Sequence, residues 1–488
     1  MKYLKYIFAV TVLTGFIYSS AYSQRLTSYW MQHLPQATYM NPAKQTNCKV
    51  FIDIPVLPNF DFNLSHSGFT INDAVIPRPY MPGSYMIDLN GIERALEDGN
   101  NINLETDFSI LNIGISLKND MHVSFGVNYK FTEYFQYPKA LIEIRRGNYR
   151  ENGTPLSFDF KQSLNLHREI YAGVSKNFNN TFYVGGKIKY LSGYFNVKAD
   201  KMNVDWYTNT AADGMYEWTF NSDFDIKAAS VIPWNFTDSA DQITGVDIDT
   251  TMLNSQTELV SALKSPGNSG LGIDIGIEYN IDNRLLLSGS LIDFGFIKWK
   301  TSPKIMTQQA TFVFDGVDIA SYLNDTTTND PMGERILSDI VDTLQNVFNP
   351  DIEEAAYSSS LNTKIYLGAN LKITDWLDAG FLYRGSFFNK NLISAYTFSA
   401  NTNFFKAWSY TLSYSIMNYS ANNVGMGLSY KIGPFQMYLI TDNIAVPLWA
   451  VNESNFSDEM LRNTKTVNFS FGLNFLICGN RYDIGLME

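Results

Sequence analysis

Hydrophobic and polar residues alternate strictly along many segments of this chain. In LGIDIGIEYN, residues 271–280, every second residue is apolar, and the residues between are glycine, acidic or amide. Because side chains alternate across a β-strand, such a segment has one apolar and one polar face. The pattern recurs at 123–131, 182–190, 365–373, 424–432 and 467–475. The sequence therefore predicts a β-rich protein.

Weaker strand candidates fill much of the remaining chain. They are 49–56, 59–66, 109–117, 157–166, 168–177, 284–298, 306–315, 376–387, 391–400, 406–416 and 435–442. Several neighbours are joined by short polar turns, at 179–180, 281–283, 374–375 and 433–434, as in β-hairpins. We expect roughly 14 to 17 strands, many near the 9–11 residues with which a tilted strand crosses a bilayer.

The connections differ in length. Short turns alternate with long excursions at about 132–156, 191–267 and 316–360, an asymmetry typical of outer-membrane barrels. The second excursion is rich in Asp, Asn and Thr and is expected to be an exposed loop with some β structure. The third predicts a helix before Asn349-Pro350, and a shorter helix is expected near 90–96. The apolar residues of the longer helix include Ile336, Ile340, Leu344 and Val347.

That longer helix has two interpretations. It packs on a small core of its own loop, or it forms a lid whose apolar side covers a pore mouth. The spacing of its residues does not separate the two.

Alternation alone does not decide between a soluble sandwich and a membrane barrel. Strands continue along about 430 residues without an evident linker, which favours one closed sheet over several domains. Aromatic residues also tend to end the apolar faces, as in the girdles of membrane barrels. They are Tyr129, Phe131, Tyr190, Tyr279, Trp299, Tyr383, Tyr430 and Phe475. A barrel is favoured; a secreted multi-domain sandwich and a propeller remain alternatives.

The first residues resemble an export signal. Lys2 and Lys5 precede a mostly apolar run, and Ala21-Tyr22-Ser23 places small residues before a cut at Gln24. The apolar run, about 13 residues, is short of the roughly 20 that a membrane anchor helix needs. We therefore expect residues 1–23 to be a cleaved signal peptide and the mature protein to be exported.

Composition narrows the function. The chain is 15% aromatic and 17% charged, with a net charge of −12, which argues against a nucleic-acid surface. The histidines His33, His66, His122 and His167 show no metal-ligand spacing, and no nucleophile elbow or phosphate loop occurs. We expect no cofactor, no metal site, no catalytic residues and no enzyme activity. A hydrolase using His122 and Ser124 on an exterior strand face is the enzyme alternative.

Residues 39–43, Tyr-Met-Asn-Pro-Ala, resemble the "NPA" element near the N-terminus of the long-chain fatty-acid transporter superfamily of outer-membrane barrels. The following KVFIDIPVLPNFDFNLSHSGFTINDAV, residues 49–75, is similar to the start of an uncharacterised outer-membrane family of Bacteroidota. That family in turn resembles the transporters and the shuttle barrels of type IX secretion. The resemblance covers the mature chain, about 25–488.

The resemblance implies an all-β fold, a closed antiparallel transmembrane barrel of about 14 strands with an N-terminal hatch and long extracellular loops carrying a helix. Residues 24–47 would form the hatch inside the lumen, with Asn41, Pro42 and Ala43 belonging to it, and residues 48–488 the barrel. Two departures stand out. Lys44 replaces the glycine that usually follows the element, and LICGNRYDIGLME follows Phe475 where barrels often end on an aromatic.

On the same resemblance, the first strand begins just after Cys48 and the last ends just before Cys478. Both cysteines then lie on the periplasmic rim, in an oxidising compartment. A disulfide between them is one hypothesis, and two free, half-buried thiols are the other.

Two functions follow as expectations for an outer-membrane protein embedded in lipid. The first is a porin-like, passive channel or carrier for hydrophobic small molecules. The second is a non-transport barrel that docks a secretion or cell-surface protein complex. The sequence does not separate them.

Overall fold

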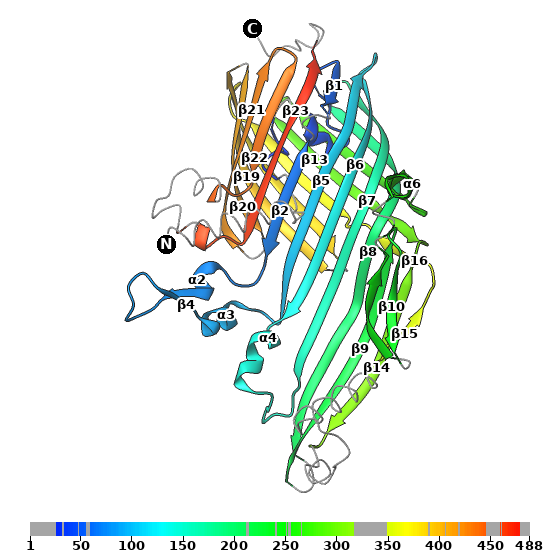
Figure 1. The fold of residues 1–488 in the computed structure, drawn as a ribbon. Coiled ribbons are helices and arrows are strands. Elements are labelled where there is room, and N and C mark those ends of the chain that lie inside the picture. Colours follow the sequence, from blue (N-terminus) through cyan, green and yellow to red (C-terminus); the bar gives the residue numbers. More distant parts are fainter. Residues whose placement is uncertain are drawn as a thin grey trace.

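The computed structural model contains a closed, antiparallel β-barrel (Figure 1). The structure describes residues 26–31, 34–46, 48–54, 59–210, 214–239, 242–249, 251, 255–264, 266–316, 349–388, 391–405, 407–417, 420–445, 459 and 461–478. The expected signal peptide, residues 1–23, lies outside them. So does the helix with Ile336, Ile340, Leu344 and Val347.

Fourteen strands in the described part of the chain form the barrel wall, counting β1 with β2 and β16 with β17 as one strand each. Neighbours along the chain pair around the wall, and β23 closes it by pairing antiparallel with β1 and β2. The strands are β1 (Val50–Asp53), β2 (Phe60–His66), β5 (Gly99–Ser116), β6 (Met121–Pro138), β7 (Leu156–Phe178), β8 (Phe182–Thr210), β12 (Asn268–Ile281), β13 (Leu285–Trp299), β16 (Tyr357–Ser360), β17 (Lys364–Lys372), β18 (Leu377–Phe388), β19 (Asn391–Phe405), β20 (Trp408–Met417), β21 (Ser420–Ile432), β22 (Phe435–Thr441) and β23 (Thr466–Ile477).

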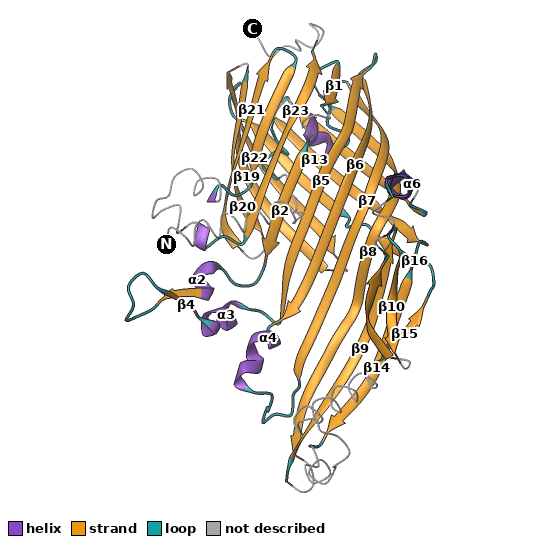
Figure 2. Ribbon diagram, in the orientation of Figure 1, coloured by secondary structure: helices purple, strands orange, loops and turns teal. Residues whose placement is uncertain are grey.

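Other elements lie outside the wall. β9 (Tyr216–Ser230), β14 (Lys304–Phe314) and β15 (Asp351–Glu353) extend the sheet beyond β8 as a wing, and β10 (Trp234–Ser239) pairs with β11 (Gln242–Ile248). β3 (Val75–Pro77) pairs with β4 (Tyr85–Ile87). The helices bounded within the described ranges are η1 (Pro35–Tyr39), α2 (Ile71–Ala74), α3 (Leu89–Ala95), α4 (Ala140–Glu143), η2 (Ile144–Arg146) and α6 (Gln256–Lys264), and Figure 2 draws helices in purple.

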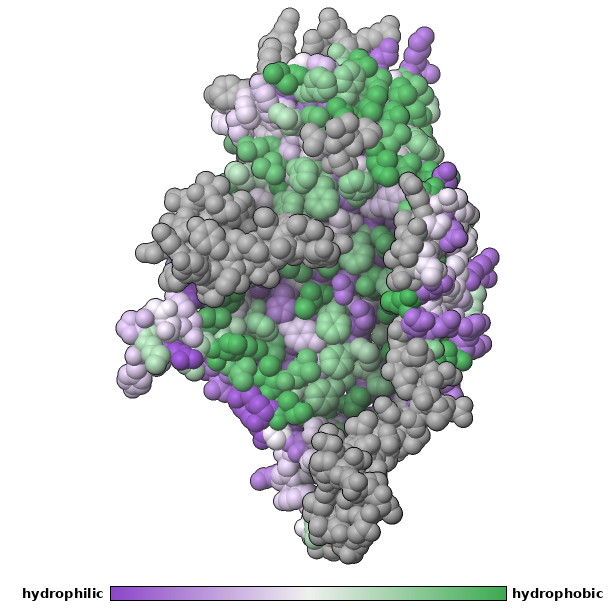
Figure 3. Space-filling model, in the orientation of Figure 1, coloured by the Kyte–Doolittle hydropathy of each residue, from purple (hydrophilic) through white to green (hydrophobic). Residues whose placement is uncertain are grey.

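The alternation in the sequence corresponds to the two faces of the wall. Along β12, Ile273, Ile275 and Ile277 are exposed outside the barrel, whereas Asp274 and Glu278 are buried inside it. Hydrophobic residues spread over the outer surface of the wall, shown in green in Figure 3. Apolar side chains facing out and polar ones facing the lumen are the arrangement of a membrane barrel. None of the helices in the described ranges is long and apolar enough to cross a membrane.

Short turns close one end of the barrel, which we call the turn end. Asn179 and Asn180 have φ values of 54° and 56°, and Asp282 and Asn283 have 51° and 53°. Positive φ in both central residues matches the twist of antiparallel strands, and Asn and Asp tolerate it best after glycine. The opposite, loop end carries the long connections.

Several strands run further than the sequence pattern predicts. β7 is one strand of 23 residues, and the candidates 157–166 and 168–177 are its two halves. The register shift between Leu166 and His167 reflects an extra residue, Tyr194, in the neighbouring β8, and the burial of β7 alternates through it at Asn165, His167 and Glu169. β8 has 29 residues and continues to Thr210, well into the excursion expected from 191. Candidate 306–315 belongs to the wing as β14.

Trp299 does not belong to the aromatic girdle, and its predicted place there is wrong. Its side chain is fully buried and packs inside the barrel with Leu191, Ile297 and Tyr357. The reason is an irregularity in β13, where Ile292 and Asp293 are both buried although they are consecutive. One extra inward residue shifts the alternation, and every later side chain in the strand changes face.

Candidate functional site: a plug and a charged network in the lumen

Residues 26–31 and 34–46, which we call the plug, lie inside the barrel and include η1, visible within the ring of strands in Figure 2. The backbone N–H groups of Leu26 and Thr27 donate to the two carboxylate oxygens of Asp442, at 3.2 and 2.7 Å. The Thr27 hydroxyl lies 2.7 Å from the Ser413 hydroxyl of β20. The N-terminal part of the plug is therefore held by the lumen face of the wall.

The structure places Asn41, Pro42 and Ala43 in the plug, against β12 and β13. The Asn41 amide donates to the Ser288 hydroxyl at 2.8 Å and to the Ile277 carbonyl at 3.3 Å. Its oxygen accepts from the backbone N–H of Ala43 at 2.9 Å. Asn41 is fully buried, and these bonds satisfy an amide that has left water.

Glycines on the polar face of the wall make room for the plug. A Cβ at Gly276 would lie 1.9 Å from the Asn41 amide oxygen, and one at Gly185 would lie 2.0 Å from the Pro42 carbonyl oxygen. A Cβ at Gly380 would meet the Trp30 ring at 2.5 Å. These glycines are inward positions of the alternating strands, where the plug backbone approaches the wall closely.

Substitution Gly276→Ala should loosen the plug without opening the wall. The added methyl group overlaps the Asn41 amide, and such overpacking costs about 1–3 kcal/mol. Amide hydrogen exchange over residues 26–46 is therefore expected to accelerate. Gly289→Ala is the matched control, because its Cβ would meet side chains at ordinary contact distances of 3.6 Å and more. Equal exchange in the two variants would show that Gly276 does not seat the plug.

Lys44, which stands where the transporter element usually has a glycine, binds the C-terminal part of the plug to β12. Its ammonium lies 3.0 Å from the Glu278 carboxylate of β12 and 4.5 Å from the ring centres of both Tyr29 and Trp30. An ammonium near aromatic faces and beside a carboxylate is stabilised by both. Lys44 thus links two parts of the plug to each other and fixes them to the wall.

An apolar patch on the lumen wall is covered by the plug. Side chains from the plug pack there on side chains from β13, β17, β18, β19 and β20, and we call the wall residues of this cluster the apolar seat. The plug supplies Leu26, Tyr29, Trp30 and Met40, and the seat is Ile292, Tyr366, Leu382, Ala395 and Met417. These inward apolar residues of the wall create a site for an apolar group, which the plug occupies here.

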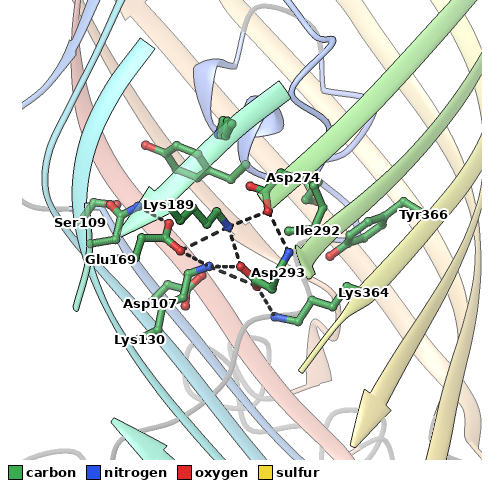
Figure 4. Close-up of a pocket in the computed structure, with 14 residues that line it drawn as sticks. Asp107, Ser109, Lys130, Glu169, Lys189, Asp274, Ile292, Asp293, Lys364 and Tyr366 are labelled. Atoms are coloured by element: carbon green, nitrogen blue, oxygen red, sulfur yellow. Dashed lines mark hydrogen bonds and ion pairs between the residues drawn. The ribbon is translucent and has the colours of Figure 1, made fainter. Parts of the chain in front are cut away.

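Next to this seat, buried charges form a network around Asp293 (Figure 4). The Asp293 carboxylate lies 2.6 Å from the Lys189 ammonium and 3.0 Å from the Lys130 ammonium. Glu169 lies 3.1 Å from Lys130 and 3.3 Å from Lys189, and Asp274 lies 2.8 Å from Lys189. Each of these charges is buried, so each depends on the others for the solvation that water would give.

A second part of the network crosses the barrel. Glu105 of β5 pairs with Lys364 of β17 and, at 3.1 Å, with Arg384 of β18. Because β5 lies far around the wall from β17 and β18, these pairs span the lumen. Lys364 also lies 3.9 Å from Asp293, which joins the two parts.

The cavity between the plug and this network is small, about 40 Å³, and is lined by Tyr39 and Met40 of the plug together with Lys187, Glu169 and Asp293 of the wall. Its lining is mainly polar. The Lys187 ammonium donates to the Thr38 carbonyl at 2.9 Å, another bond between plug and wall. An apolar solute would therefore find a closed, charged passage along the barrel axis.

Some members of this network are recognisable in the sequence. Asp274 alternates with apolar residues in LGIDIGIEYN, which places it on the polar face of a strand. Other members lie at inward positions of alternating strands. In the sequence, each of them is recognisable only as a single charged residue on the polar face of its strand. They are Glu105, Lys130, Glu169, Lys189, Lys364 and Arg384. Asp293 gives no such signal, because it sits where the alternation of β13 shifts.

Cys48 and Cys478 form a disulfide in the structure. They lie directly outside β1 and β23, where the first and last strands meet at the turn end. The bond joins the chain segment after the plug to the end of the last strand. It therefore closes the seam of the barrel and anchors the base of the plug.

His122 and Ser124 do not match the exterior pair that a hydrolase would need. His122 is buried on the lumen side, stacked on the Phe51 ring at 5.9 Å, and its Nδ1 lies 3.2 Å from the Ser116 hydroxyl. Within the described ranges, no group of three or more His, Cys, Asp or Glu residues could hold a metal ion.

A search among curated proteins gives no match. Among solved structures, the Ralstonia pickettii toluene transporter TbuX is 9% identical, with a TM-score of 0.37, 92% of this chain covered and 95% of the other. A Pseudomonas aeruginosa FadL homologue is 9% identical, with a TM-score of 0.31 and the same coverage.

The translocator domain of the Neisseria meningitidis autotransporter NalP is 8% identical, with a TM-score of 0.29, 89% of this chain covered and 90% of the other. At scores this low, the likeness carries no argument about lumen residues or substrates. A family model matches residues 42–442, most of the chain and nearly the whole wall. The chain therefore belongs to the family of unknown function DUF5723.

Proposed function

We propose that the protein is a passive channel or carrier for hydrophobic small molecules in the outer membrane, with the plug as its closed state. The observation that carries the proposal is the apolar seat. Ile292, Tyr366 and Leu382 face the lumen beside the buried charges around Asp293, and plug side chains including Trp30 cover them. An apolar ligand would replace those plug side chains without exposing the seat to water.

The charged network limits the route. Moving an apolar solute past Lys130, Lys189 and Asp293 would separate buried ion pairs, which is costly. The strand pairing beside the seat is interrupted at Asp293–Gly295, because β13 pairs with β17 up to Ile292 and with β16 only from Phe296 onward. Two hydrogen bonds bridge the interruption, from the Leu361 N–H to the Gly295 carbonyl at 2.9 Å and from the Thr363 hydroxyl to the Asp293 carbonyl at 3.2 Å, and a sideways exit requires them to open. The solute would enter at the seat as the plug moves and leave through this interruption into the bilayer.

Locking the plug to the wall tests the proposal. The Thr27 and Ser413 hydroxyls are 2.7 Å apart, so the double variant Thr27→Cys/Ser413→Cys should form a disulfide across the plug–wall contact. Uptake of an apolar dye by cells carrying the oxidised variant should fall to the level of cells without the protein. Reduction should restore it.

The two single-cysteine variants and the wild type, oxidised and reduced in parallel, are the controls. They also account for reduction of the native Cys48–Cys478 bond. Undiminished uptake by the fully locked protein would contradict a carrier that works by plug movement.

The second candidate is a barrel that docks a secretion or cell-surface complex. It is favoured by the wing, in which β9 pairs with β8 along 15 residues and with β14 along its other edge. Such a rigid sheet beyond the wall is more than a passive conduit requires. Co-purification of a stoichiometric partner from membranes, lost when β14 is removed, would support docking; purification of the barrel alone would not.

A further inference from the structure

A small arm leaves the barrel between β2 and β5 at the loop end and extends sideways beyond the wall (Figure 1). Its base is firmly packed. Ala74, Ile92 and Leu96 form a buried cluster with Tyr137 of β6, and the Asp88 N–H donates to the Ala74 carbonyl at 2.8 Å. The direction of the arm is therefore set by a folded core.

The outer part of the arm, residues 77–87 (PRPYMPGSYMI), exposes several large hydrophobic side chains. Tyr80 is 95% exposed, Ile87 66% and Met81 56%. In a chain of net charge −12, this stretch has one arginine, Arg78, and no acidic residue. Exposed apolar groups of this kind mark interaction surfaces, and tyrosines with a basic residue are typical of membrane interfaces.

We propose that residues 77–87 dock on the membrane leaflet at the loop end, with Tyr80 and Met81 among the lipid groups and Arg78 at a phosphate. A lipid surface is the occupant that the position favours. The two strands that carry the arm present Leu64 and Phe108 outward, so the arm continues the apolar outer face of the wall. A sideways arm at the rim meets lipid before it meets a soluble protein.

Such docking would fix the height and tilt of the barrel in the bilayer. The base of the arm packs on β6, so lipid contact at the tip is transmitted to the wall rather than absorbed by a loose loop. This inference rests on the membrane insertion assumed in the proposed function, and on nothing about the solute carried.

Nitroxide labels test it, with the protein in phosphatidylethanolamine/phosphatidylglycerol liposomes. A label at Met81→Cys should collide more with oxygen, which concentrates in lipid, than with a water-soluble nickel chelate. A label at Leu412→Cys on the wall, 57% exposed, is the lipid reference, and one at Met215→Cys near the wing, 68% exposed, is the aqueous reference. Adding Arg78→Glu should shift the Met81 label toward the aqueous reference.

A Met81 label that matches Met215 while Leu412 reports lipid would overturn the docking and leave the barrel in its membrane. A Met81 label shielded from both reagents would also overturn it, because it would indicate protein contact. If Leu412 itself reports water, the membrane insertion fails together with the inference.

Discussion

Removal of residues 26–46 should change a closed barrel into an ion-conducting one, because water then reaches and solvates the ion pairs of Glu105, Lys364 and Asp293 that cross the lumen. The plug fills the lumen through bonds to Asp442, Ser413 and Ser288 and covers the apolar seat. Without the plug, the strands of the wall remain paired, but the plug no longer closes the lumen. In planar bilayers, the wild type should show a nearly closed baseline and the deletion variant a steady conductance, with faster dye uptake in cells.

The deletion must leave a folded barrel for this comparison to hold. Heat-dependent migration on gels checks folding, and Trp30→Ala offers a milder change that removes only one side chain from the seat. A folded deletion variant with wild-type conductance would contradict a lumen closed by the plug.

Neutralising Asp293 should produce the largest loss of stability from a single substitution. Asp293→Asn keeps a residue that tolerates the φ of 58° found there, and it removes the negative charge between Lys130 and Lys189. Breaking a buried ion pair by removing one partner costs about 3–5 kcal/mol. The midpoint of urea unfolding in micelles should fall accordingly.

Asp375→Ala is the surface control for this measurement. Asp375 pairs with Lys372 at 2.7 Å, but its side chain is 91% exposed, so its loss should change the midpoint little. Equal midpoints for Asp293→Asn and the wild type would show that the network is not a stabilising element.

Much of the wall was predictable from the sequence, because membrane and lumen impose a period of two on each strand. The outward position of Ile275 and the inward position of Asp274 can therefore be predicted from the alternation alone. Outside the membrane both faces meet water, and the period no longer marks a strand. In β8 an extra residue at Tyr194 also breaks the alternation just after 190, although the strand continues to Thr210.

The site was predictable only in part. The Asn-Pro-Ala element indicated a segment inside the lumen, but its partners are set by how the wall closes. Lys130 and Asp293 are 163 residues apart and meet only across the barrel. The shift at Asp293 also hid the inward position of Trp299, since a single additional residue reverses the faces of a strand.

The most direct test of the account is a nitroxide scan along β12 in liposomes. Labels placed one at a time at residues 271–279 should alternate with a period of two. Leu271, Ile273, Ile275 and Ile277, which are 57%, 42%, 51% and 51% exposed, should be reached by oxygen and shielded from a water-soluble nickel chelate. Labels at the positions between them should be sheltered from lipid. Reversed alternation, or oxygen and nickel access that is uniform along the strand, would contradict a barrel whose apolar face meets the membrane.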